Sequence, residues 1–215
     1  MKNIKDELQH IILGHEPTGQ ASQLKKIQRF LRSNAETSFA AKKQQRFKSE
    51  ETTTLLAFAE QEDIIYTPAI REIDFISEGA EQKVYRLDGS HVIKTNAGVF
   101  YECWLDYFNS LLIHNYFFPA TAYTFLGFKM ISDELNAVVM QKFIVTSEPT
   151  DLTAVRVFLE YNNFHNNRNN DYINSELGLI FEDLHDENVL SANGVLLKHL
   201  IQNKYIPSFE SSSLK

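Results

Sequence analysis

The 215-residue sequence predicts an α+β fold, in which a helical segment precedes a five-stranded antiparallel sheet with one packed helix. Apolar residues recur at helical spacing up to about residue 62, which is typical of amphipathic helices. From about residue 66 the apolar period falls to two, which is typical of half-buried strands. The order strand, strand, strand, helix, strand, strand then predicts the sheet and its helix.

The helical segment is expected to cover residues 1–66 and to hold three helices. Gly14 ends the first helix, and Ser22 is suited to cap the second. The third is expected to begin near Asn34 or Thr37 and to end with an apolar stretch at residues 55–59. The residues that place the first two helices on one face each are Ile4, Leu8, Ile11, Ile12, Leu24, Ile27, Phe30 and Leu31.

A basic cluster lies within the third predicted helix, interleaved with Gln and Glu residues. We interpret it as a solvated helix face rather than a patch for nucleic acid or a protein partner. The net charge of −7 also argues against a general nucleic-acid binder. The cluster consists of Lys42, Lys43, Arg46 and Lys48.

Short apolar runs define the predicted sheet and the elements after it. Strands are expected at residues 73–76, 84–87, 91–94, 123–130 and 137–144, with a helix at 99–115. A further helix is expected from Asp151 to Tyr161, capped by Thr150 or Asp151. The asparagine-rich residues 162–174 predict a loop, because Asn favours turns. Three short strands are then expected at 179–182, 188–190 and 195–197.

The single cysteine and the absence of long apolar segments bear on location. Cys103 has no second cysteine to pair with, which fits a reducing compartment, and its apolar neighbours favour a buried helix cysteine over a reactive thiol. The charged first residues predict no signal peptide, and no apolar run is long enough for a bilayer. We therefore expect a soluble cytoplasmic protein.

Two features within the predicted sheet suit phosphate binding. Gly79 and Ala80 lie in a turn between two strands, where backbone N–H groups can face phosphates. Lys94 ends an apolar strand fifteen residues after Gly79 and can neutralise phosphate charge. Taken alone, the glycine indicates an ordinary hairpin turn and the lysine a solvent-facing strand end. Their spacing favours the functional interpretation.

The most specific motif is Asp183-Leu184-His185-Asp186-Glu187-Asn188, bounded by apolar strand-like runs. An aspartate followed five residues later by an asparagine resembles the catalytic loop of protein kinases and of aminoglycoside-phosphotransferase-like enzymes. The resemblance implies that Asp183 is the catalytic base and that Asn188 holds a metal ion on the nucleotide phosphates. A chance acidic turn is the alternative.

Longer stretches resemble the kinase-like domain of bacterial mobile-element polyvalent proteins over about residues 72–198. They are residues 76–85, 104–107, 111–115, 168–172 and 182–190. The resemblance implies a serine/threonine/tyrosine kinase of a conjugative element or phage. It implies a kinase-like domain at 67–215, with an N-lobe at about 67–147 and a reduced C-lobe at about 148–207. ATP and Mg²⁺ are the implied cofactors.

Further roles follow from the register of this resemblance. Met140 is expected at the back of the adenine pocket, with the backbone of Gln141 and Phe143 bonded to the base edge. Glu102 or Asp106, on the helix after Lys94, is expected to pair with that lysine, and a solvated helix carboxylate is the alternative for each.

The sequence departs from the kinase pattern in two places. Phe181 and Glu182 stand where protein kinases carry the His-Arg of the catalytic loop. No Asp or Glu follows between Asn188 and Glu210, and Lys198-His199 occupies the position of the metal-binding aspartate, where a lysine would repel Mg²⁺. We expect from this a truncated or divergent C-terminus.

Two functions are therefore expected from the sequence. The first is an ATP-dependent phosphotransferase acting on a protein or small-molecule hydroxyl. The second is a degenerate pseudokinase that serves a mobile genetic element as a nucleotide-sensing or protein-binding module. Residues 1–66 are a candidate surface for a protein partner. The sequence does not identify the phosphoacceptor.

Overall fold

The computed structural model describes residues 3–14, 23–38, 44–144, 149–185, 189–192, 195–198 and 203–205. The chain forms two compact units. The Lys94 unit comprises residues 17–112 and 122–143. The Asp183 unit comprises residues 1–16, 113–121 and 144–215. The helical segment predicted at 1–66 therefore contributes residues to both units.

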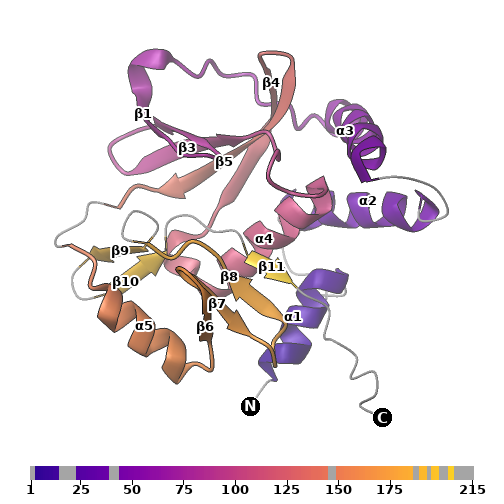
Figure 1. The fold of residues 1–215 in the computed structure, drawn as a ribbon. Helices are drawn as coiled ribbons and strands as arrows, with labels where there is room; N and C mark the ends of the chain where they lie inside the picture. The colour runs from indigo at the N-terminus through magenta and orange to yellow at the C-terminus, as the bar shows by residue number, and fades with distance from the viewer. Residues whose placement is uncertain are drawn as a thin grey trace, which may run out of the picture. The chain divides into compact units, whose positions relative to one another are not determined.

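The Lys94 unit is built on a five-stranded antiparallel sheet of order β1-β2-β3-β5-β4, which confirms the predicted α+β fold with its sheet (Figure 1). A one-turn 3₁₀ helix, Glu72–Asp74, leads into β1. The strands are β1 (Phe75–Glu78), β2 (Lys83–Arg86), β3 (His91–Asn96), β4 (Thr124–Ile131) and β5 (Glu134–Lys142). The helices are α2 (Gln23–Ser38), α3 (Gln44–Gln61) and α4 (Trp104–Phe117), the last of which continues into the Asp183 unit.

Aromatic side chains of α4 pack on the sheet, as expected for the predicted packed helix. The Phe108 ring lies 5.6 Å from that of Phe125 and 5.9 Å from that of Phe128, both on β4. Trp104 meets Phe128 edge-on at 6.0 Å. Such edge-to-face pairs stabilise a core beyond the area that they bury. This aromatic layer fixes the first turns of α4 against β4.

Helix α4 begins at Trp104 rather than at the predicted Val99. A side chain of α3 caps its first turn. The buried carboxylate of Glu51 accepts hydrogen bonds from the backbone N–H groups of Trp104 at 2.6 Å and Leu105 at 3.4 Å. A negative charge at a helix N-terminus satisfies unpaired N–H groups and complements the helix dipole. The cap comes from far earlier in the chain, so local sequence patterns did not reveal it.

The third predicted helix also needs correction. Helix α2 continues to Ser38, so Asn34 and Thr37 lie inside it and do not start a new helix. Lys48 is not a solvated residue, because its ammonium donates to the backbone carbonyls of Gly98 and Tyr101. Ser22, Lys42, Lys43 and the side chain of Arg46 lie outside the described residues.

The outer edge of β4 is covered by the chain that leaves α3. Tyr66 donates its N–H to the Phe128 carbonyl at 2.7 Å, and Phe128 donates to the Ile64 carbonyl at 2.8 Å. Gly127 adopts a φ of +146°, and a Cβ there would lie 2.8 Å from Ile64 O and Tyr66 N. Only glycine permits this close approach of two backbones.

In the part that the structure describes, the Asp183 unit contains helices α1 (Ile4–Leu13) and α5 (Leu152–Tyr161), the end of α4 and two small sheets. A 3₁₀ turn lies at Pro119–Thr121. A four-stranded sheet has the order β11-β8-β7-β6, and β9 pairs with β10 in a separate hairpin. The strands are β6 (His165–Arg168), β7 (Asp171–Asn174), β8 (Leu179–Phe181), β9 (Val189–Ala192), β10 (Val195–Lys198) and β11 (Asn203–Tyr205).

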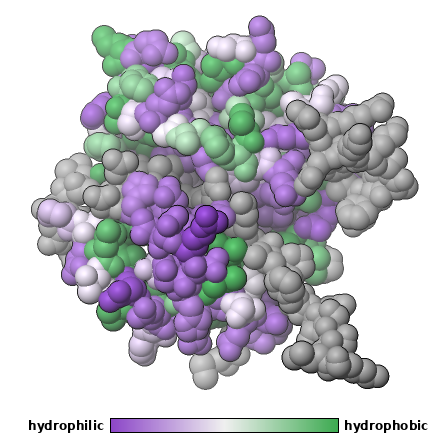
Figure 2. All heavy atoms as spheres, in the orientation of Figure 1, coloured by the Kyte–Doolittle hydropathy of each residue, from purple (hydrophilic) through white to green (hydrophobic). Residues whose placement is uncertain are grey.

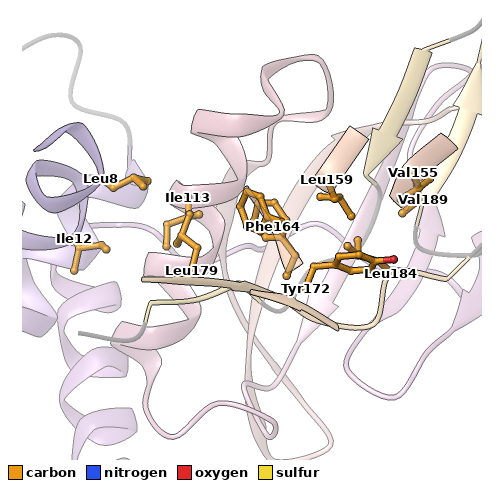
Figure 3. Close-up of a cluster of buried hydrophobic side chains, with 11 residues drawn as sticks. Leu8, Ile12, Ile113, Val155, Leu159, Phe164, Tyr172, Leu179, Leu184 and Val189 are labelled. Carbon is orange, nitrogen blue, oxygen red and sulfur yellow. The ribbon is translucent and has the colours of Figure 1, made fainter. Parts of the chain in front are cut away.

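Apolar side chains from these elements form one core, which Figure 3 shows in close-up. Leu8 and Ile12 of α1 and Ile113 of α4 belong to it, together with residues of α5 and of the four-stranded sheet. Leu184, the second residue of the predicted catalytic loop, and Val189, which directly follows the loop, are also members. Their burial ties both ends of the loop to the core.

Several helix ends follow the sequence signals. Gly14 ends α1 in the left-handed region with a φ of 69°, as its position after the apolar run predicts. Asp151 caps α5, with Oδ1 accepting from the N–H groups of Thr153 at 2.8 Å and Ala154 at 3.2 Å. Within the described residues, no helix combines the length and the apolar composition that a membrane crossing requires.

The asparagine-rich segment forms the hairpin β6–β7 and not the predicted loop. All four side chains of β6 are exposed, so no apolar alternation marks it as a strand. Asn169 takes the left-handed φ of 50° that the turn needs, and Asn166 Nδ2 donates to its carbonyl at 2.7 Å. Figure 2 shows hydrophilic residues gathered over this hairpin. The asparagines thus serve the turn, as predicted, but within a sheet.

Replacement of Gly127 by alanine is expected to destabilise the protein. The new Cβ would meet two backbone atoms, and its φ is strained for any residue with a side chain, so the loss should exceed about 1 kcal/mol. Urea unfolding measures the change. Gly89→Ala is the control, because a Cβ at Gly89 meets nothing within 4 Å. Equal midpoints for the two variants would contradict the close-approach explanation.

Removal of the Glu51 carboxylate is expected to weaken the start of α4. Loss of a side-chain cap costs roughly 0.5–2 kcal/mol, so Glu51→Ala should lower the free energy of urea unfolding by about that amount. The neighbouring exposed residue gives the control Glu50→Ala, expected within about 0.5 kcal/mol of wild type. If the two variants unfold alike, Glu51 is not the cap that holds α4.

Candidate functional site

The side chain of Lys94 is fully buried, which is rare for a lysine. It lies in the middle of β3, opposite Val84 of β2 and Val139 of β5. Its ammonium lies 5.4 Å from the centre of the buried Tyr123 ring, an arrangement that favours a cation. The sequence left open a solvent-facing strand-end lysine, and the structure excludes that alternative.

Burial lowers the pKa of Lys94 to about 7, since the apolar surroundings disfavour the charged ammonium. Lysine is almost never fully buried unless a partner group repays the cost of desolvation. A strongly perturbed pKa in such a place marks a candidate functional residue. An anion brought next to this amine would restore its charge.

The turn between β1 and β2 is exposed and tightly closed. Gly79 donates its N–H to the Gln82 carbonyl at 3.0 Å, and both Gly79 and Ala80 are exposed. A Cβ at Gly79 would meet nothing within 4 Å. The turn therefore has room to move, and its phosphate-binding role stays a prediction.

The register of β5 places the side chains of two predicted adenine-pocket residues, Met140 and Gln141, on opposite faces of the sheet. Met140 lies opposite Ile93, so its side chain points to the face opposite that of Lys94. Gln141 lies opposite Val92 on the same face as Lys94, and it is buried. The Phe143 N–H donates to the Ser90 carbonyl at 2.7 Å. Gln141 therefore suits the back of a pocket on the Lys94 face better than Met140 does.

Neither predicted carboxylate partner of Lys94 is buried with it. Glu102 and Asp106 are both exposed, and Glu102 lies in the loop before α4 rather than on the helix. Asp106 raises the pKa of Glu51 and of Cys103, which places its charge near the start of α4. Burial is the main cause of the raised Cys103 pKa and keeps this half-buried thiol protonated. The ion pair with Lys94 stays a prediction.

In the Asp183 unit, the predicted base is held at the surface by its own backbone. Asp183 N–H donates to Asp171 Oδ1 at 2.9 Å, and the next N–H, of buried Leu184, donates to the Asn170 carbonyl at 3.0 Å. The Asp183 side chain is 70% exposed. Its φ of 56° is uncommon for a residue other than glycine and often accompanies function.

The exposed Asp183 carboxylate can accept a proton from an incoming hydroxyl. His185 Nε2 lies 3.3 Å from Asp183 Oδ2, and the His185 N–H donates to the Asp183 carbonyl at 3.0 Å. The role of Asp183 as catalytic base stays a prediction. Sequence reasoning predicted Asp183 as the base, whereas the hydrogen bond from its N–H to Asp171 could be seen only in the structure.

The predicted metal ligand Asn188 lies outside the described residues, as does His199. Lys198 ends β10 opposite Val189. Across the parts of the chain that the structure describes, no group of three His, Cys, Asp or Glu residues is placed to hold a metal ion. Metal binding by Asn188 stays a prediction.

Comparison with known families identifies the chain. The family model for the serine/threonine/tyrosine kinase found in polyvalent proteins matches residues 48–199, which is more than half of the chain. The chain belongs to this family. No curated protein and no solved structure matches it. The match begins at Lys48, so the region shared with this polyvalent-protein kinase family includes Lys48 and Glu51, the two α3 residues that hold the start of α4.

The low pKa of Lys94 predicts that stability rises with pH above neutrality. In the unfolded chain the lysine keeps its proton up to about pH 10.5, whereas in the folded protein Lys94 has a pKa of about 7 and releases its proton near that pH. The unfolded state thus binds more protons between these values, and the free energy of unfolding rises by at most about 1.4 kcal/mol per pH unit.

Urea unfolding of wild type and Lys94→Met at pH 7, 8 and 9 measures this effect. The variant lacks the titrating amine, so its stability relative to wild type should fall as pH rises. A difference that stays constant across this range would contradict a pKa near 7 for Lys94.

Proposed function

We propose that this chain is an ATP-dependent phosphotransferase that acts on a hydroxyl group of a protein or a small molecule. The observation that carries the proposal is the full burial of Lys94 within β3 of a kinase-family sheet. In protein kinases a glycine-rich loop covers the phosphates, and the phosphate-binding lysine lies on strand β3. A buried amine with a pKa of about 7 is suited to bind an anion.

Each unit supplies one chemical role in this proposal. In the Lys94 unit, the amine binds the nucleotide phosphates, the Gly79–Ala80 turn covers them, and Gln141 and Phe143 contribute to the base pocket. In the Asp183 unit, the exposed carboxylate accepts the proton of the acceptor hydroxyl. A bound magnesium ion would neutralise phosphate charge, with Asn188 as its proposed ligand.

A second function, nucleotide sensing or protein binding by a degenerate kinase fold, is favoured by one observation. The strand β10 ends at Lys198, where the kinase pattern calls for an acidic metal ligand. A lysine repels the cation that an aspartate would bind. Under this alternative ATP binds in the Lys94 unit, but no phosphoryl transfer follows.

Thermal unfolding with and without Mg·ATP tests nucleotide binding. Wild type should be stabilised by about 2.7 kcal/mol when ATP is 100-fold above its dissociation constant. Lys94→Ala should lose most of this stabilisation. Lys83→Ala, at an exposed lysine on β2, is the control and should respond as wild type does. Absence of any shift in wild type would refute the nucleotide site.

Formation of ADP in the presence of candidate acceptors distinguishes the two functions. Asp183→Asn should keep the ATP-dependent thermal shift and lose transfer by at least about 100-fold, the typical contribution of general base catalysis. Binding without transfer in wild type would support the sensing function instead.

A further inference from the structure

Glu81 lies in the turn between β1 and β2, and its side chain is held by a tyrosine outside that turn. Tyr101 Oη donates a hydrogen bond to Glu81 Oε2 at 3.3 Å. Glu81 is half-buried, whereas Gly79 and Ala80 beside it are exposed. The carboxylate of Glu81 therefore reaches from this turn to the buried Tyr101.

Tyr101 belongs to a buried group of aromatic hydroxyls next to Lys94. The ring centres of Tyr101 and Tyr107 lie 5.2 Å apart. The Nζ atom of Lys94 lies 5.4 Å from the centre of the Tyr123 ring. All three tyrosines are buried. Burial raises the pKa of each hydroxyl, and the negative charge of Glu81 raises it further. Glu81 and Lys94 thus act on one cluster.

A nucleotide phosphate and the Glu81 carboxylate carry charge of the same sign. In a buried setting such charges repel strongly, because little water screens them. We propose that Glu81 is a competing anion, which holds the place of a nucleotide phosphate beside the tyrosine cluster and leaves with its turn when phosphates reach Lys94. This inference rests on the proposed function of Lys94 as a phosphate-binding residue.

The turn is built so that Glu81 can leave without disturbing the core. Gly79 and Ala80 are exposed, and space around Gly79 is open. The strands behind the turn are anchored separately, through the pairing of Val84 with Lys94. Displacement therefore exchanges the Tyr101–Glu81 hydrogen bond for contacts of the turn with the phosphates.

Calorimetric titration with ATP and with adenosine tests the competition. Glu81→Gln removes the charge and should tighten ATP binding about three- to ten-fold, while adenosine affinity stays within two-fold of wild type. Glu78→Gln removes an exposed charge from the last residue of β1, just before the turn, and should leave both affinities unchanged. Unchanged or weaker ATP binding by Glu81→Gln would overturn the proposal.

If neither wild type nor any variant binds nucleotide, the proposed function is refuted, but the inference about Glu81 is not yet tested. Acetylation of Lys94 then tests that inference separately. Mass spectrometry after brief treatment with acetic anhydride at pH 8 measures how far Lys94 is protected. Glu81→Ala should increase Lys94 labelling at least three-fold, whereas Glu78→Ala should match wild type. Equal labelling of Lys94 in both variants would show that Glu81 does not cover the lysine, and would overturn the inference.

Discussion

The burial of the Lys94 amine inside the five-stranded sheet is the constraint on which the rest of the Lys94 unit depends. A charge in such a place is costly, and the depressed pKa of about 7 is the result. The surrounding structure keeps the amine in place through the Tyr123 ring and the strand pairs on either side. Helix α4 packs its aromatic side chains on this sheet, and α3 holds α4 through Glu51 and Lys48.

In the Asp183 unit, hydrogen bonds fix the backbone that carries the exposed Asp183 carboxylate. Leu184 and Val189 anchor the loop in the core, while Asp171 and Asn170 bind the two N–H groups that set the direction of Asp183. The carboxylate is exposed, and its action on a substrate hydroxyl is the role proposed for it. The Lys94 unit thus contains a buried amine, and the Asp183 unit contains an exposed carboxylate.

Much of this fold could be predicted from periodicity, since apolar spacing identified α1, α2, α5 and the five strands of the main sheet. Contacts between distant residues, such as Glu51 with Trp104, could not be predicted, because no local pattern encodes them. Polar strands were also missed, because β6 has no buried face to mark it. At the candidate site, spacing singled out Lys94 and Asp183, but only the strand register shows that Gln141, and not Met140, lies on the Lys94 face of β5. Glu81 carries no sequence signal of its own.

Proton uptake during ATP binding tests most directly whether Lys94 is a phosphate-binding amine kept neutral by burial. Calorimetric titration at pH 8.5, in two buffers of different ionisation enthalpy, measures it. Wild type should take up nearly one proton, because phosphate charge restores the ammonium, and Lys94→Met should take up none. ATP binding to wild type without proton uptake would contradict this role of Lys94.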